Sequence, residues 1–289
     1  SMYQLISIIG LSAFATNNFI KTEPFLINTY TAIINHKNKE NSLYYHIQIL
    51  YLIANTLFRN KKFDDSQHYL SLMLTQMMSQ RKKYYNHFKP KYNLLVALNF
   101  NYTNQQNKAI ELLQLSTKLK HVDIELAHDI KLSLIMFHFQ NGAHNQAYAL
   151  LSKLNHTDKW YIEKIGKEWL IKKNLVELLL LIELKHIDLL ESRLLSFKRG
   201  YFKYLRSIDQ HRVITYLSFI ETYYKHPEKV SLEVFKNKVE SSFEWIETYK
   251  EDIFVMSFYS YLKGKMNKTD LYKTTLQLIN QAREELSNW

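Results

Sequence analysis

Cysteine is absent from this chain of 289 residues, and glycine and proline are scarce, with only 5 Gly and 3 Pro. Without cysteine there are no disulfides, no thiolate zinc sites and no cysteine nucleophile. So few glycines and prolines exclude the many tight turns of an all-β sandwich and the glycine-rich loops that hold phosphates. The composition therefore favours helices joined by short polar turns.

A long hydrophobic run is also missing. A helix that crosses a membrane needs about 18 uninterrupted apolar residues. The most apolar stretch, 175–190, is interrupted by Glu177, Glu183, Lys185 and Asp188. We therefore expect no membrane partner and a cytoplasmic protein.

The beginning of the chain has an apolar stretch, Leu5–Ala15, that no Lys or Arg precedes. A signal peptide begins with a basic segment, and this stretch continues directly into helical periodicity, so we interpret it as a buried helix. Ser1 and Met2 look like the remnant of a cleaved tag followed by a start or introduced methionine. We therefore expect the chain to be one domain of a longer protein.

Apolar and aromatic residues are plentiful, at 46% and 14% of the chain, with 21 Tyr and 16 Phe. This is enough apolar surface to offset the chain entropy lost on folding, so we expect a folded chain. The 38 Lys and Arg outnumber the 27 Asp and Glu, giving a net charge of +11. This charge permits an acidic partner, such as nucleic acid or an anionic protein surface, or it reflects a base bias of the genome; both explanations remain open.

A pattern that recurs along the chain is clearest in residues 53–70. A small residue near the end of one helix is followed by a polar turn, and Phe63-Asp-Asp-Ser66 then opens the next helix. This arrangement resembles the core of the tetratricopeptide repeat (TPR), in which a small residue and an aromatic on one helix pack against a small and a bulky residue on the next. The matching positions are Ala54, Leu57, Phe63, Ser66 and Leu70.

The same frame fits three more segments. The small residue of the second helix recurs at Ser66, Ala109 and Ala147, and Leu190 stands in its place in the fourth segment, at separations of 43, 38 and 43 residues. A standard TPR repeats about every 34 residues, so we expect lengthened helices or an extra linker in each unit. The other positions of the frame are Ala97, Phe100 and Leu113; Ile135, His138 and Leu151; and Leu178, Leu181, Ile187 and Leu194.

One helix pair cannot bury its apolar stripe alone, so we expect the pairs to stack. The predicted fold is an all-α, right-handed α-solenoid of antiparallel helix pairs, forming a single TPR-like domain over 1–289. An opening pair is expected in 1–41, four TPR-like pairs in 42–210 and capping helices in 211–289. The predicted core stripe of the fourth unit, with spacings of three and four, is Leu190, Leu194, Phe197, Tyr201, Leu205 and Ile208.

Proline and glycine predict several helix limits. Pro24 and Pro90 are expected in the first turns of helices. The helix over 212–225 should end before Pro227, because a residue that precedes proline is disfavoured in the α conformation. Gly142 can adopt the positive φ that ends a helix.

The C-terminal part of the chain reads as two helices, over 232–249 and 253–266, followed by a last helix that Thr269-Asp270 opens and that runs to Trp289. Two runs in this half, Leu189–Phe197 and Glu251–Tyr259, also resemble a group of bacterial TPR-containing proteins. That resemblance implies a fold and no particular activity.

Motifs for catalysis are absent: there is no G-x-S-x-G elbow and no Walker or dinucleotide loop. The acid pairs at 64–65, 251–252 and 284–285 are expected at helix starts or on solvated helix faces. We therefore predict a protein that is not an enzyme and that needs no cofactor.

The histidines suggest no metal either. The nearest candidates are His121 and His128, close to Asp123, Glu125 and Asp129. Metal ligands on a helix lie three or four residues apart, whereas these histidines are two turns apart. We predict no metal site, and we expect His138, at a helix-packing position, to be a core or edge residue.

Two basic clusters are the strongest signal beyond the fold. Residues 81–92 hold five Lys or Arg and four aromatic residues without an acid, a mixture that can bind phosphates and stack on bases. Alternatively, these aromatics pack between helices. The second cluster, around 193–212, lies off the core stripe. The residues concerned are Arg81, Lys82, Lys83, Lys89 and Lys91 in the first cluster, and Arg193, Lys198, Arg199, Lys203 and Arg206 in the second.

The resemblance to TPR proteins implies a concave groove lined by the first helix of each pair. By position, the groove residues are Gln48, Tyr51, Asn55, Arg59, Lys91, Tyr102, Asp129, Met136 and Gln140. Their amides, aromatics and few charges suit an extended peptide or a bound helix; alternatively, some of them are packing contacts. They lack the two-Lys, two-Asn clamp that holds the terminal carboxylate of a peptide in some TPR domains.

The leading hypothesis is a non-enzymatic interaction scaffold or docking module that binds a peptide or partner protein in this groove. The alternative is a nucleic-acid-binding or regulatory helical repeat that uses the two basic clusters. The sequence itself names neither the partner nor the oligomeric state.

Overall fold

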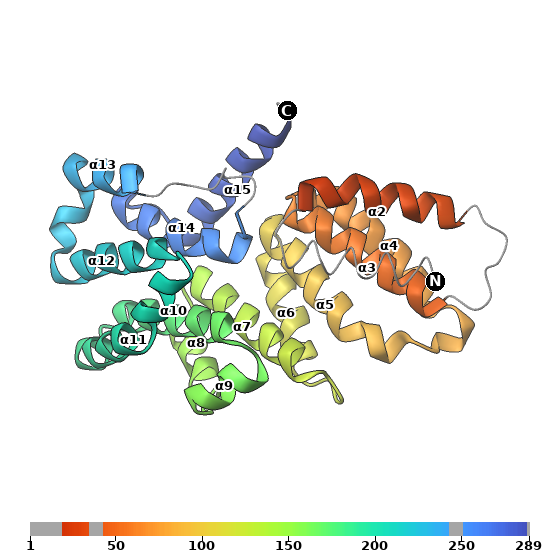
Figure 1. Ribbon diagram of the computed structural model, residues 1–289, viewed down its shortest axis with the longest axis horizontal. Coiled ribbons are helices and arrows are strands. Elements are labelled where there is room, and N and C mark those ends of the chain that lie inside the picture. The colour runs from red at the N-terminus through yellow and green to blue at the C-terminus, as the bar shows by residue number, and fades with distance from the viewer. Residues whose placement is uncertain (1–18, 35–42, 243–250, 288–289) are drawn as a thin grey trace. The chain divides into compact units, whose positions relative to one another are not determined.

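The computed structural model describes residues 19–34, 43–242 and 251–287, and within these ranges the chain forms helices and turns without a strand (Figure 1). The predicted helix at Leu5–Ala15 lies outside the described residues. None of the described helices is long and apolar enough to cross a bilayer.

The chain packs as two compact units. Unit 1 contains the described residues up to Lys120, together with 251–253 and those from Leu276 onward. Unit 2 contains the described residues of 121–245 and residues 254–275. Both units are built from antiparallel helix pairs.

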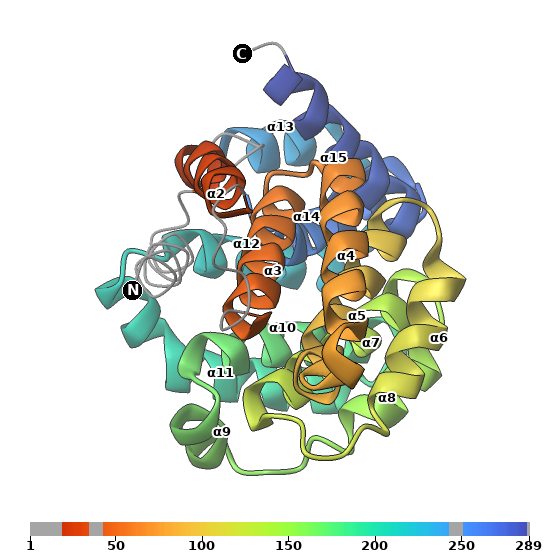
Figure 2. The ribbon, with the colours of Figure 1, turned by 90° about the vertical axis from the view of Figure 1, so that its right-hand side faces the viewer.

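In unit 1, helices α2, α3 and α4 lie side by side, and the second view shows α3 and α4 as neighbours along their length (Figures 1 and 2). Helix α15 from Leu276 onward also belongs to this unit. The elements are α2 (Phe19–Ile34), α3 (Leu43–Arg59), α4 (Phe63–Met78), the 3-10 turn η1 (Gln80–Lys82), α5 (Tyr85–Tyr102), α6 (Gln106–Ser116) and α15 (Leu271–Ser287).

The small residues of the repeat frame hold α3, α4 and α5 together. The Ser66 hydroxyl donates a hydrogen bond of 2.8 Å to the carbonyl oxygen of Ala54, and the Asn99 amide donates one of 3.1 Å to the Ser66 hydroxyl. All three residues are fully buried. A larger side chain at Ser66 would separate these helices, so the frame predicted a real packing constraint.

Unit 2 contains the third and fourth predicted pairs, and the small residue Ala147 and the bulky Leu151, Leu190 and Leu194 are buried in it as expected. A short helix, α9, is inserted between these pairs and accounts for part of the long repeat. The elements are α7 (Ile124–Gln140), α8 (His144–Leu151), α9 (Asp158–Lys164), α10 (Lys167–Glu183), α11 (Ile187–Ser207), α12 (His211–Lys225), η2 (Pro227–Ser231), α13 (Glu233–Ser242) and α14 (Ile253–Asn267).

The turn inside each of the four predicted pairs has the same backbone conformation. Lys61, Asn104, Gly142 and Lys185 have φ angles of 61°, 62°, 70° and 58°. They are separated by 43, 38 and 43 residues, which confirms the predicted repeat. After each, an amide donates to the carbonyl five residues earlier, the bond that closes a Schellman turn. These bonds run from Lys62 to Leu57, from Gln105 to Phe100, from Ala143 to His138 and from His186 to Leu181, at 2.8 to 2.9 Å.

Two predicted helix starts are wrong. Pro24 and Pro90 lie inside α2 and α5, each five residues after the first residue of its helix. Proline removes a hydrogen bond from a helix, but an aromatic side chain before each proline, Phe19 or Phe88, is buried. Packing of that aromatic keeps the residues that precede the proline in the helix.

Other predicted limits are confirmed. Helix α12 ends at Lys225, directly before His226-Pro227. The Asp270 carboxylate accepts the amide of Lys273 at 2.9 Å and so caps α15. Of the predicted helix 232–249, α13 covers 233–242, and residues 243–249 lie outside the described residues.

The predicted core of α11 needs two corrections. Ile187 is 42% exposed and Ile208 is 39% exposed, whereas the stripe between them is buried. Ile187 is the first residue of α11, and Ile208 follows its last residue. The helical face that the other residues share therefore does not extend to these two.

Candidate functional site

Four of the predicted groove residues come together in unit 1. Gln48, Tyr51 and Asn55 lie on one face of α3, and all three are half-buried. The Asn55 amide nitrogen donates to the Tyr51 hydroxyl at 3.4 Å, and the Lys91 ammonium of α5 lies 5.9 Å from the centre of the Tyr51 ring. These four residues are called the α3–α5 surface below.

The chemistry of the α3–α5 surface suits a polar, extended ligand. An asparagine or glutamine amide offers one acceptor and two donors, and a lysine ammonium offers three donors. A peptide backbone presents the complementary amide and carbonyl groups, and the Tyr51 ring offers a flat apolar face beside them. The surface can therefore bind peptide backbone and side chains together.

Two further predicted groove residues of unit 1 make contacts within that unit. Arg59, the last residue of α3, forms an ion pair with Asp252, and its guanidinium lies 5.9 Å from the Phe19 ring. Tyr102 is buried, with its ring 6.2 Å from that of Phe58. Both side chains thus connect parts of unit 1.

In unit 2 the predicted groove residues lie on α7 and differ in exposure. Asp129 is exposed, whereas Met136 and Gln140 are each only 1% exposed. The Gln140 amide donates to the Ser257 hydroxyl of α14 at 3.0 Å. Helix α14 therefore covers this part of α7.

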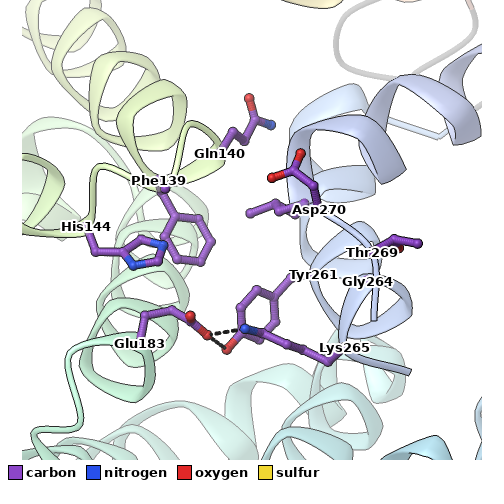
Figure 3. A pocket seen from close by; sticks show the side chains of 11 residues that line it. Phe139, Gln140, His144, Glu183, Tyr261, Gly264, Lys265, Thr269 and Asp270 are labelled. Atoms are coloured by element: carbon purple, nitrogen blue, oxygen red, sulfur yellow. Dashed lines mark hydrogen bonds and ion pairs between the residues drawn. The ribbon is translucent and has the colours of Figure 1, made fainter. Parts of the chain in front are cut away.

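Unit 2 also contains a cavity of about 180 Å³, where the C-terminal ends of α7 and α10 face α14 (Figure 3). Gln140 is the one predicted groove residue in its lining. Among the lining residues are Phe139, Gln140, His144, Glu183, Tyr261 and Lys265.

Glu183, Tyr261 and Lys265 point toward one another in this cavity (Figure 3). The Tyr261 hydroxyl donates to the Glu183 carboxylate at 2.5 Å, and the Lys265 ammonium lies 2.7 Å from it. Burial and the charge of Glu183 raise the pKa of Tyr261 well above its usual value. Burial alone would lower the pKa of Lys265, but its hydrogen bond to Glu183 and the charge of that carboxylate raise it. The Glu183 carboxylate in the cavity is therefore paired with the Lys265 ammonium and held by the Tyr261 hydroxyl.

His144 lies at the edge of the same group, with its ring 5.5 Å from that of Phe139. Burial lowers the pKa of His144, while the Glu183 carboxylate opposes that shift. Sequence reasoning missed this cavity. The sequence signal for it was weak, because Glu183 is one of four charged residues in the most apolar stretch of the chain.

The basic clusters differ in their neighbours. Arg81, Lys82 and Lys83 are exposed on the turn between α4 and α5. In the second cluster, on α11, Arg193 lies 3.2 Å from Glu177, and the half-buried Lys198 lies 2.6 Å from a carboxylate of α12. The remaining three residues of that cluster, Arg199, Lys203 and Arg206, are exposed.

One acid pair, at residues 251–252, lies at a helix start but is not solvated. Glu251 is 6% exposed, and the neighbouring Asp252 forms the ion pair with Arg59. The pair stands directly before Ile253, the first residue of α14, as the expectation of a helix start has it, but Glu251 is not solvated, because its backbone carbonyl accepts a hydrogen bond from a buried lysine, Lys61. By contrast, Asp64, at the start of α4, is 90% exposed as expected.

The histidines pack against other side chains. The Nδ1 atom of His128 donates a hydrogen bond of 2.7 Å to the carbonyl oxygen of Ile124, and its ring contacts the ring of Trp169 edge-on at 5.6 Å. His138 is buried, and burial lowers its pKa. Within the described ranges, no three His, Asp or Glu side chains gather into a group that could hold a metal.

The sequence matches no family model and no curated protein. A solved structure of the Rap conjugation gene regulator of the plasmid pLS20, in complex with the Phr* peptide, is similar to this chain, with a TM-score of 0.67 and 14% sequence identity. The similarity covers 99% of this chain and 74% of that one. At this identity the likeness shows the fold alone, and it confirms the predicted all-α helical repeat.

Proposed function

We propose that this chain is a non-enzymatic interaction module that binds a peptide, or an extended segment of a partner protein, on the α3–α5 surface. The observation that carries the proposal is the half-buried cluster of Tyr51, Asn55 and Lys91 on the first helices of two successive pairs. The Rap regulator, which has a similar fold, is bound to a peptide in its own structure.

The arrangement also suggests which peptide would bind. The Lys91 ammonium lies over an aromatic ring and makes no ion pair within the described residues. The Coulomb attraction between such a cation and an acidic side chain is stronger in a partly desolvated site than in bulk water. We therefore expect a peptide with an acidic residue at Lys91, next to a backbone segment that pairs with Asn55.

The test is a selection from a random peptide library with the purified chain, followed by calorimetric titration of the selected peptides. The double variant Asn55→Ala, Lys91→Ala should weaken binding at least about tenfold, the effect of losing one or two hydrogen bonds to a charged or amide group. Lys108→Ala is the matched control, because it removes an exposed lysine of α6 that also lies over an aromatic ring, 5.7 Å away.

Two results would contradict the proposal. If the wild-type chain selects no peptide, the function is wrong. If the double variant binds the selected peptides as tightly as wild type, the α3–α5 surface is not the site. Arg59→Ala is a poor probe of binding, because it breaks the ion pair with Asp252 and so changes the packing of unit 1.

A further inference from the structure

Unit 1 contains a long acid-free stretch. Residues 66–110 include six Lys or Arg and no Asp or Glu. They form most of α4, the turn η1, all of α5 and the start of α6. The nearest acids along the chain are Asp65 and Glu111, at the two ends of this stretch. No carboxylate within it neutralises its positive charge.

The turn between α4 and α5 displays this charge. Gln80, Arg81 and Lys82 have φ angles of 43°, 56° and 62°, so three successive residues with side chains adopt the left-handed conformation. Such residues enter this region at an energetic cost, and runs of them are rare. The turn places three consecutive basic side chains, Arg81, Lys82 and Lys83, on the surface.

Aromatic rings lie among these cations. The Lys83 ammonium is 5.1 Å from the Tyr84 ring, and those of Lys82 and Lys89 are 5.9 Å and 5.3 Å from the Tyr85 ring. Both tyrosines are half-buried. Tyr84 also packs edge-on against Tyr44 of α3, with ring centres 5.5 Å apart, which fixes its orientation.

None of the four basic residues, Arg81, Lys82, Lys83 and Lys89, makes an ion pair in the described part of the chain. The basic cluster on α11 is different, because carboxylates neutralise two of its five members. The turn of unit 1 therefore combines uncompensated charge with aromatic faces.

We propose that this turn binds single-stranded nucleic acid. The site, here called the basic turn, consists of residues 80–85 and Lys89. Phosphates contact Arg81, Lys82 and Lys83, and an unpaired base stacks on Tyr84 or Tyr85 as the lysine over that ring moves to a phosphate. An acidic peptide that lacks aromatic side chains would use the charges but would not stack on the rings, and a base in a duplex is not open to stacking. The site is distinct from the α3–α5 surface and goes beyond the peptide function.

The first experiment measures fluorescence anisotropy of a labelled oligo-dT or oligo-U of about 15 nucleotides, a length that spans a typical single-strand site. Three to four phosphate contacts predict a log–log salt slope of roughly −2 to −3. Affinity should then fall roughly 20- to 50-fold between about 50 and 200 mM salt. The absence of binding at the lowest salt overturns the proposal.

The second experiment compares two double charge reversals. Arg81→Glu, Lys82→Glu should weaken binding at least about 30-fold, because two contacts to phosphate become repulsive. The control is Lys203→Glu, Arg206→Glu, which makes the same change in net charge on exposed residues of α11 and should change affinity less than about threefold. Equal losses in the two variants would show a response to net charge alone and would overturn the assignment. Circular dichroism checks that both variants keep their helices.

Two further measurements distinguish the ligand class. Tyr85→Ala should weaken oligonucleotide binding roughly five- to tenfold through lost stacking, and its failure to do so removes the base-stacking role. Polyglutamate, added at the same concentration of charges, should compete poorly. Equal competition would mean that the turn binds any polyanion and would overturn the nucleic-acid assignment. The variant Arg81→Glu, Lys82→Glu should still bind the selected peptides. If the chain binds no oligonucleotide, the proposed peptide function is therefore unaffected.

Discussion

Helices α3 and α7 have the same place in their helix pairs but different surroundings. On α3, Tyr51 and Asn55 are half-buried and form part of the α3–α5 surface. On α7, Met136 and Gln140 are each 1% exposed, and Ser257 of α14 covers Gln140. The position of a residue in the repeat thus determines the side of the helix on which it lies. Whether that face is open depends on a helix from elsewhere in the chain.

The strongest test of this comparison is the pair of variants Met136→Ala and Tyr51→Ala. Met136→Ala should lower the free energy of unfolding by about 3 kcal/mol, because it leaves a cavity in a closed core. Tyr51→Ala should lower it by less than about 1 kcal/mol, since solvent can fill the space. Urea denaturation of both variants measures this difference, and equal losses would show that the two faces are equally closed.

The second prediction concerns Glu183, at the end of α10, which contacts Tyr261 and Lys265 of α14. Glu183→Ala should lower the free energy of unfolding by about 2 kcal/mol, because Tyr261 and Lys265 lose their shared acceptor in a partly buried site. The estimate lies below that for a fully buried pair, since 29% of the Lys265 side chain is exposed.

Glu221→Ala is the control for that variant. Glu221 pairs with Lys198, and the side chains are 23% and 32% exposed. Screening by solvent should keep its loss below about 1 kcal/mol. A Glu183→Ala variant that is as stable as this control in chemical denaturation would mean that the group at the cavity does not stabilise unit 2.

A buried lysine gives unit 1 a pH-dependent stability. Lys61 is fully buried, and its ammonium donates to the carbonyl oxygen of Glu251 at 3.0 Å. Burial lowers the pKa of Lys61 to about 8, although the Glu251 charge acts in the opposite direction. Between pH 8 and the ordinary lysine pKa, the unfolded chain therefore binds more protons at this residue than the folded chain.

Stability should accordingly rise with pH in that window. The gain from Lys61 between pH 8 and 9.5 is roughly 1.5 kcal/mol. Denaturant melts over this pH range measure it, and Lys61→Met should remove the rise. Lys62→Met, which changes the neighbouring and more exposed lysine, should keep it. An unchanged slope in Lys61→Met would show that another group produces the effect.

The smallest effect on stability should accompany a large effect on binding. Asn55→Ala should change the free energy of unfolding by less than about 0.5 kcal/mol and should still weaken the binding of a selected peptide. Gln140→Ala, at the covered face, should reduce stability by about 1 kcal/mol, because it removes the hydrogen bond to the Ser257 hydroxyl, and should leave peptide affinity unchanged. Paired denaturation and calorimetry separate these cases. A peptide affinity that depends on Gln140 would instead extend the binding site to unit 2.

Local patterns predicted much of the fold. The spacing of small residues gave the repeat of 43, 38 and 43 residues, and the turns at Lys61, Asn104, Gly142 and Lys185 follow it. These features depend on neighbours a few residues apart, since a helix stripe and a Schellman turn are short-range structures. Pro24 and Pro90 were misplaced because buried aromatics outweighed the local preference of proline.

The sequence by itself determined an all-α chain of helix pairs, their spacing and the basic, acid-free character of the turn before α5. Tertiary structure decided which of the repeat faces are open. It placed Ser257 on Gln140, 117 residues away in the chain, and brought Lys265 to Glu183. Periodicity records that a face is apolar or polar, but it does not record which distant helix covers that face. For that reason the α3–α5 surface and the cavity of unit 2 could be told apart only in three dimensions.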